Sequence, residues 1–173
     1  MKSTGVVRKI DELGRIVIPK EIRRNLRIHD GENLEIFIDD NSIILKKFSK
    51  MVDLKDIISR LCDLMNDTMQ KDMFVTDRDH IIAVTKSLEK IVDKNNNEKL
   101  MELLLNSESY SSKEAETLLF DGEEVSGYFY IVPIITSMDT LGLVGMICEK
   151  ENILLMELVK FISRILSEKI DIA

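Results

Sequence analysis

Residues 4–24 constrain the fold of this chain more than any other stretch of its sequence. Two short runs rich in β-branched residues, 6–10 and 15–18, are separated by Asp11-Glu12-Leu13-Gly14, which predicts two strands joined by a turn. Gly14 can take a positive φ angle without steric cost, which suits the turn. Pro19 follows at once and fits the first position of a helix, where its missing N–H is not needed.

The first fifty residues, called the head below, are therefore expected to form a β-β-α-β-β unit. The second pair of strands is predicted at 34–38 and 42–47, around the turn Asp39-Asp40-Asn41. Phe37 and Phe48 are interpreted as core residues rather than as platforms for stacked bases. So short a unit buries too little apolar surface alone, and its short strands leave open edges. We expect two copies to interleave their strands into one small barrel.

Charge separates the head from the remainder of the chain, called the body. Residues 1–50 carry 11 Lys and Arg against 8 Asp and Glu, a net charge of +3, whereas residues 51–173 carry 13 against 23, a net charge of −10. A basic part on an acidic chain predicts nucleic-acid contact through the head alone. The helical spacing of Lys20, Arg23, Arg24 and Arg27 predicts a basic stripe, although Glu21 and Asp30 could equally pair with Lys20 and Arg27.

The composition excludes several other classes of protein. No apolar run is long enough to span a membrane, and the N-terminus lacks a signal-peptide pattern, so a cytoplasmic protein is expected. Cys62 and Cys148 are isolated in apolar surroundings and are expected to be buried free thiols. His29 and His80 fall in predicted turns, outside any nucleophile, phosphate-loop or metal-binding motif. We expect no enzyme activity, no metal and no cofactor.

The body is predicted to be an α+β domain, an antiparallel sheet bracketed by helices. A helix capped by Asp53 is expected to run to residue 69, and an interruption at 95–97 divides the helical segment 87–106. The apolar stripes of the helices at 54–68 and 154–169 are wider than one sheet needs, which favours helix bundling between copies over simple coverage of the sheet. The strands are expected at 73–76, 81–85, 115–120, 128–135 and 143–149.

The head resembles the AbrB-type swapped-hairpin DNA-binding domain of transition-state regulators. The resemblance rests on Lys2-Ser3-Thr4-Gly5, Val7-Arg8-Lys9, the run from Asp11 to Pro19, Glu21-Ile22-Arg23-Arg24 and Ile43 to Lys47. It implies an obligate dimer that forms a swapped-hairpin β-barrel and reads DNA shape more than a strict sequence. The residues that it implies at the DNA are Arg8, Arg15, Arg23 and Arg24, with Lys9 in support.

The body resembles the GAF/PAS class of sensor domains. Residues 75–79 resemble the hairpin that opens such a sheet, and 132–134 with 141–147 resemble its closing strands. Behind an AbrB-type head, this body makes the whole chain similar to the two-domain transition-state regulators of spore-forming bacteria. The resemblance implies a DNA-binding domain at 1–50, and a sensor and oligomerisation domain at 51–173 that includes the linker helix 53–69.

The function that follows is a DNA-binding transcription regulator of sporulation genes, either an activator or a repressor. Its expected partners are double-stranded DNA in AT-rich or deformable promoter regions and further copies of itself, as a homodimer through the head and a homotetramer overall. A small-molecule ligand lined by 87–112 and 128–135 is one interpretation of the body, and a sensor without a ligand is the other. The alternative function is an antitoxin, because AbrB-type heads also serve toxin–antitoxin pairs, with a short disordered tail in place of a body.

Overall fold

The computed structural model describes residues 5–28, 30–31, 33–47, 51, 54–137 and 139–172, with the side chain at 172 left aside. The chain divides into two compact units, Met1–Phe48 and Ser49–Ala173, which contain the head and the body respectively and are described separately. The expected capping residue Asp53, together with His29 and Phe48, lies outside the described residues. Among those that are described, no helix combines the length and apolarity needed to cross a membrane.

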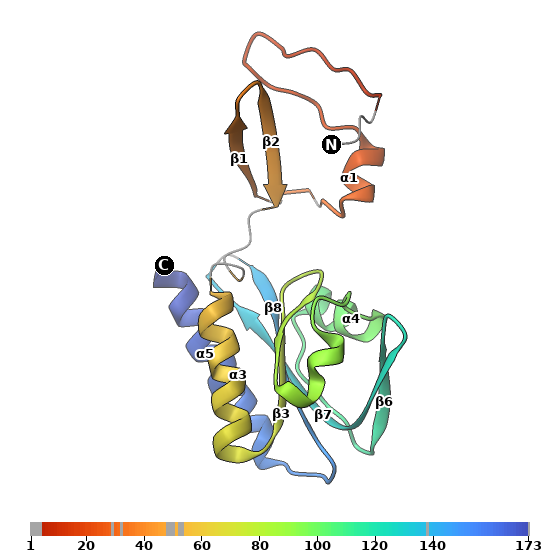
Figure 1. The fold of residues 1–173 in the computed structure, drawn as a ribbon, viewed down its shortest axis with the longest axis vertical. Helices are drawn as coiled ribbons and strands as arrows, with labels where there is room; N and C mark the ends of the chain where they lie inside the picture. Colours follow the sequence, from red (N-terminus) through yellow and green to blue (C-terminus); the bar gives the residue numbers. More distant parts are fainter. Residues whose placement is uncertain are drawn as a thin grey trace. The chain divides into compact units, whose positions relative to one another are not determined.

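The head contains one short helix and one hairpin (Figure 1). Helix α1 (Lys20–Asn25) begins directly after Pro19, which occupies the N-cap with ψ 147° and so lies one position earlier than the sequence predicts. Strands β1 (Leu34–Asp39) and β2 (Ser42–Lys47) pair antiparallel around Asp40, whose φ is 43°. This hairpin confirms the second predicted pair of strands.

The first predicted pair of strands is absent from a single copy of the head. Residues 5–19 form no strand, although the turn between the two segments is present. The turn is closed by the N–H of Asp11 bonding to the carbonyl of Arg15 at 3.1 Å and that of Gly14 bonding to Asp11 at 3.0 Å. A β-branched segment becomes a strand only where another strand supplies the hydrogen-bonding ladder. No such partner is supplied to residues 6–10 and 15–18 within one chain.

The head also lacks a core of its own. Not one of its described residues is buried. Val7 is 86% exposed and Ile38 is 83% exposed, and Phe37, which was expected in the core, is 38% exposed with Lys46 lying over its ring. The apolar side chains that stand exposed come from both arms of the turn and from the hairpin: Val6, Val7, Ile10, Leu13, Ile16, Val17, Leu26, Ile36, Phe37, Ile38, Ile43 and Leu45.

The body is built on one antiparallel sheet with the strand order β4-β3-β8-β7-β5, to which β6 adds by pairing with β7. The two long central strands, β7 and β8, pair from Tyr128↔Cys148 to Ile135↔Thr140. The sequence predicted every strand except β5, and it began β7 five residues too late. The strands are β3 (Asp72–Thr76), β4 (Ile81–Val84), β5 (Tyr110–Ser111), β6 (Glu116–Phe120), β7 (Glu123–Ile135) and β8 (Thr140–Cys148).

Helices cover both faces of this sheet, as Figure 1 shows. Helices α3 (Lys55–Met69) and α5 (Leu154–Ile172) pack on one face, and α4 (Glu98–Asn106) with the 3₁₀ helix η1 (Lys86–Ile91) lies over the other. The predicted interruption at 95–97 is confirmed, because Asn97 caps α4 by accepting the N–H of Leu100 at 2.9 Å. Leu54 occupies the N-cap of α3 without a side-chain cap bond.

Alternation along β7 supplies both apolar layers. Tyr130, Val132 and Ile134 pack beneath α3 and α5, whereas Phe129 and Ile131 face α4 and η1. Both layers consist mainly of fully or nearly fully buried aliphatic and aromatic side chains. The body therefore buries its own apolar surface on both faces of the sheet, unlike the head, and holds it in register by antiparallel pairing.

Candidate nucleic-acid interface

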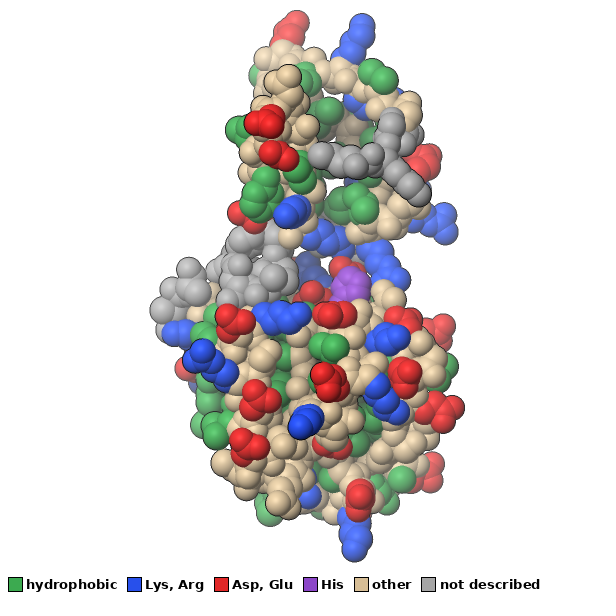
Figure 2. Space-filling model, in the orientation of Figure 1, with side chains coloured by type: hydrophobic (Ala, Val, Ile, Leu, Met, Phe, Trp, Pro, Cys, Tyr) green, Lys and Arg blue, Asp and Glu red, His purple; other side chains and the backbone are tan. Residues whose placement is uncertain are grey.

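The cations expected at DNA lie on three segments of the head. Arg8 and Lys9 are exposed on the extended arm that precedes the turn, and one Nη of Arg8 donates to the carbonyl of Val7 at 3.1 Å. Arg15 ends the turn itself. Arg23 and Arg24 lie on α1. All five predicted residues therefore belong to a small basic unit, and in the view of Figure 2 many acidic side chains are scattered over the body.

The turn holds Arg15 in a defined geometry. The Oδ1 of Asp11 accepts the backbone N–H of Leu13 at 3.0 Å and that of Arg15 at 2.8 Å. The Oδ2 of the same carboxylate accepts Nε of Arg15 at 2.7 Å, while the Arg15 side chain remains 72% exposed. Gly14 has a φ of +74°, the left-handed conformation that a non-glycine residue seldom adopts. Sequence reasoning placed Asp11 in the turn without seeing its bond to Arg15.

The helix presents its two arginines differently. Arg24 is exposed, whereas Arg23 is 38% exposed and forms an ion pair with Asp30 through Nη1. The buried Nε of Arg23 has no hydrogen-bond acceptor among the described residues. Asp30 was expected to compete for Arg27, so the pairing partner was predicted wrongly.

The predicted basic stripe does not continue to Arg27. Helix α1 ends at Asn25, and Arg27 has a φ of 52°, which turns its backbone out of the helical path. The carbonyl of Arg27 instead accepts Nζ of Lys47 at 2.6 Å, which ties the end of the helix to β2. A six-residue helix cannot carry the i+7 position of the stripe, and only the positions up to Arg24 share its surface.

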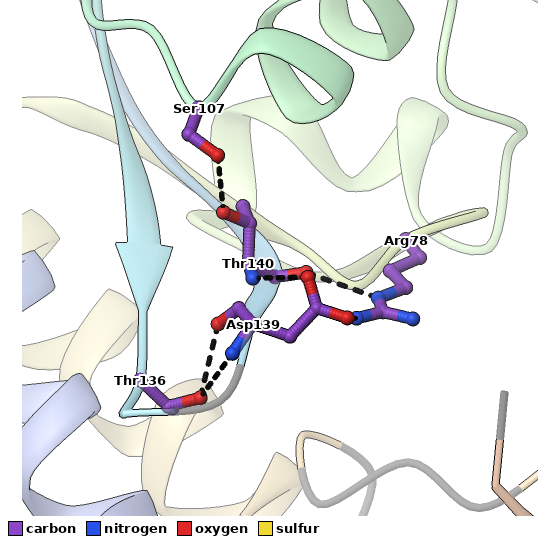
Figure 3. A network of polar contacts seen from close by, with 5 residues as sticks. All are labelled: Arg78, Ser107, Thr136, Asp139 and Thr140. Atoms are coloured by element: carbon purple, nitrogen blue, oxygen red, sulfur yellow. Dashed lines mark hydrogen bonds and ion pairs between the residues drawn. The ribbon is translucent and has the colours of Figure 1, made fainter. Parts of the chain in front are cut away.

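The body carries a polar network rather than a basic surface at the connection between β7 and β8 (Figure 3). Arg78, from the turn between β3 and β4, donates Nε to the carbonyl of Thr140 at 3.0 Å and forms an ion pair with Asp139. The hydroxyls of Ser107 and Thr140 lie 2.6 Å apart, which links the end of α4 to the start of β8. Thr136 closes the connection by accepting the N–H of Asp139 at 3.3 Å.

The candidate ligand region of the body is filled by side chains. Leu100 and Leu103 of α4 pack with Phe129 and Ile131 of β7 in the apolar layer where a ligand was considered. An open cavity of about 420 Å³ lies elsewhere, where α3 leads into β3 and β8 leads into α5. Its lining is mixed in charge and includes Lys71, Asp72, Ser126, Cys148, Lys150 and Asn152.

Both cysteines are buried free thiols, as the sequence predicted. Burial, with a smaller contribution from the charge of Asp63, raises the pKa of Cys62 to about 12. Burial also raises the pKa of Cys148, whose Sγ donates to the carbonyl of Lys150 at 2.7 Å. Within the described residues, no group of three or more His, Cys, Asp and Glu side chains is placed to hold a metal ion.

A basic unit with an open apolar surface, followed by an acidic α+β body, defines a two-domain regulator. The family model described as stage V sporulation protein T C-terminal, transcription factor, matches residues 53–170. The chain belongs to this family of transcription factors and is a sporulation transcription regulator. It is 40% identical to stage V sporulation protein T of Bacillus subtilis (strain 168) over 148 residues, covering 83% of each chain.

The head has its own set of relatives. It is 65% identical over 48 residues to the transition state regulatory protein AbrB of the same organism, covering 28% of this chain and 50% of AbrB. The solution structure of the N-domain of abrB is 63% identical, with coverage of 28% and 94% and a TM-score of 0.27. A second family model, described as antidote-toxin recognition MazE, bacterial antitoxin, matches residues 7–51.

Proposed function

We propose that this regulator acts by docking its head on double-stranded promoter DNA that is AT-rich or easily deformed. The contacts are made by Arg8, Arg15, Arg23 and Arg24, with Lys9 in support. The observation that carries the proposal is the set of exposed cations on a small unit of net positive charge, on a chain whose body is strongly acidic. Phosphates attract such a unit without regard to sequence, and the bending energy of the DNA then supplies selectivity.

We infer that two copies of the head form one swapped-hairpin β-barrel. The support is that the arms at 6–10 and 15–18 have strand composition but no strand partner, while none of the described head residues is buried. Interleaving a second copy gives each arm a ladder and covers the apolar side chains of both hairpins at once. The exposure of Phe37 in a single chain is then relieved in the dimer, where it lies in the shared core.

The body is proposed to be a GAF-like domain that assembles the dimers into a tetramer in the cytoplasm. Its helices retain apolar residues away from their own sheet, with Leu64 of α3 57% exposed and Phe161 of α5 62% exposed. Such rows are suited to bundling with the helices of another copy. A small-molecule ligand would have to displace apolar packing beneath α4, so assembly is the primary role that we assign to the body.

The antitoxin alternative draws on the match of residues 7–51 to the MazE model. An antitoxin would follow its head with a short segment that orders on a toxin. Here the head is followed by a body with two buried apolar layers and a match to the sporulation family. A DNA-binding regulator without enzymatic activity accounts for both units of the chain, and the antitoxin accounts only for the head.

A salt titration of DNA binding tests the proposal directly. The affinity of the full chain for an AT-rich double-stranded fragment should fall steeply with salt, and Arg15→Ala or Arg24→Ala should each reduce the log–log slope by about one. Arg164→Ala is the matched control, because Arg164 is an exposed arginine of the body paired with Glu168 at 3.2 Å. Binding that ignores both head variants, or that falls equally with the control, would remove these arginines from the interface.

A further inference from the structure

The carboxylate of Asp11 does two jobs in the turn that carries Arg15. Through Oδ1 it binds two backbone N–H groups and so fixes the path of the chain from Asp11 to Arg15. Through Oδ2 it binds Nε of the Arg15 guanidinium at 2.7 Å. These bonds, first those from the Arg15 backbone and then those from its side chain, lower the pKa of Asp11, which keeps the carboxylate ionised at neutral pH.

This arrangement leaves the useful edge of the guanidinium available. Of the five N–H groups of arginine, the one on Nε points to Asp11, and the four on the two Nη atoms are not part of that bond. The Arg15 side chain is 72% exposed, so the Nη pair can reach solvent. Two Nη atoms in one plane match two phosphate oxygens, and this bidentate geometry is the reason that arginine is favoured at phosphates.

We propose that Asp11 is the positioning residue of the DNA interface, which holds Arg15 in advance in the orientation that grips a phosphate. The proposal rests on the function proposed above, in which Arg15 contacts DNA. Asp11 does not touch the DNA itself. Its contribution is to remove the rotamer freedom that a long side chain would otherwise lose on binding.

Two effects of Asp11 on binding have opposite signs, which makes the proposal decidable. As a negative charge beside a phosphate-binding group, Asp11 should weaken binding, and its neutralisation should then strengthen it. As a positioning residue, it should strengthen binding by about threefold to tenfold, the usual consequence of ordering one long side chain beforehand. Surface charge is screened by salt, whereas geometric ordering is not, so we expect the positioning effect to dominate at physiological ionic strength.

The test measures binding of the full chain to an AT-rich double-stranded fragment, with Asp11→Asn in the wild-type and Arg15→Ala backgrounds. Asparagine retains an oxygen for the two backbone bonds but sets an N–H₂ donor against Nε, so it frees the guanidinium while keeping the turn. The control is Glu12→Gln, which removes the same charge from the neighbouring exposed residue of the turn, one without hydrogen bonds or ion pairs among the described residues. If Asp11→Asn does not fold, Asp11→Ser serves in the same design, since a hydroxyl can also cap the turn.

The expected result is a threefold to tenfold loss for Asp11→Asn in the wild-type background, no loss in the Arg15→Ala background and no loss for Glu12→Gln. Tighter binding by Asp11→Asn, with Arg15→Ala still weakened, would overturn the positioning role and leave the proposed function intact. Equal loss in both backgrounds would overturn it as well, because the effect would then pass through the fold of the turn. If Arg15→Ala bound like the wild type, the Arg15 contact and this inference would both be lost.

Discussion

At the scale of the residue, the two thiols show how burial alone can make a group sensitive to pH. Cys62 lies on α3 with no exposed surface, under the apolar layer that α3 and α5 share. The thiol must remain neutral there, because a thiolate would be separated from water, and its pKa rises accordingly. In the unfolded chain the same thiol is hydrated and titrates at its ordinary value.

We therefore predict that stability declines in alkaline solution partly through Cys62. Below the unfolded pKa of 9.0 the contribution of this thiol is complete, and between 9.0 and about 12 only the unfolded chain releases the proton, so stability falls as pH rises. The free energy of unfolding should lose up to about 1.4 kcal/mol per pH unit from this group. Urea unfolding under reducing conditions at a series of pH values should show a shallower decline for Cys62→Ala, and parallel curves would contradict the prediction.

The arginines of the head illustrate how far single residues could be read from sequence. Arg15 and Arg24 were expected to be exposed cations, and they are. The carboxylates that hold Arg15 and Arg23, Asp11 and Asp30, were not identified as their partners. The signal for Asp11 was present as an acid four residues before an arginine across a turn, whereas the seven-residue separation of Asp30 from Arg23 depends on where the helix ends.

At the scale of the element, the connection between β7 and β8 is a point where several elements meet. Arg78 reaches it from the β3–β4 turn and Ser107 from the end of α4. The backbone N–H and the hydroxyl of Ser137 bond to Asp171 of α5. One short connection thus ties together elements that cover opposite faces of the sheet.

We predict that Arg78→Ala lowers the free energy of unfolding of the body by about 1 kcal/mol, because it removes an ion pair and a bond to a carbonyl at a side chain that is one-third exposed. The matched control is Arg164→Ala, whose ion pair with Glu168 lies on the open surface of α5 and should contribute less than about 0.5 kcal/mol. Urea denaturation of the two variants compares them. Equal losses would show that the network adds nothing beyond a surface ion pair.

The outcome for strands depended on where each strand finds its neighbour. In the body, β3, β4, β7 and β8 were predicted within a few residues because their partners lie in the same chain. The arms at 6–10 and 15–18 have equally strong strand composition and form no strand in one copy. Composition reports the preference of a segment for an extended backbone, and the ladder itself needs a second strand.

At the scale of the whole molecule, the outer rows of α3 and α5 decide how copies assemble under the proposed function. We predict that Phe161→Glu lowers the molar mass from that of a tetramer to that of a dimer, because a charge in a helix bundle is left desolvated. DNA binding should weaken with it through lost multivalency. Light scattering after size-exclusion chromatography measures the mass.

The control for this prediction is Leu105→Glu. Leu105 is 78% exposed on α4, which covers the opposite face of the sheet, so the mass should be unchanged. A tetramer that persists in Phe161→Glu would place the assembly surface away from α5, and loss of the tetramer in both variants would point to general destabilisation of the body.

The sequence by itself determined what depends on local chemistry. Spacing and side-chain type were enough for the basic character of the head, the hairpin at 34–47, the break before α4 and the two buried thiols, because each follows from residues near one another in the chain. Only the tertiary structure decided which groups meet at a distance. It ended α1 before Arg27, placed Asp11 and Asp30 on their arginines, filled the layer beneath α4 with side chains and left the arms of the head without a partner. Those outcomes depend on packing and on hydrogen-bonding partners far along the chain or on another copy, which a local pattern does not specify.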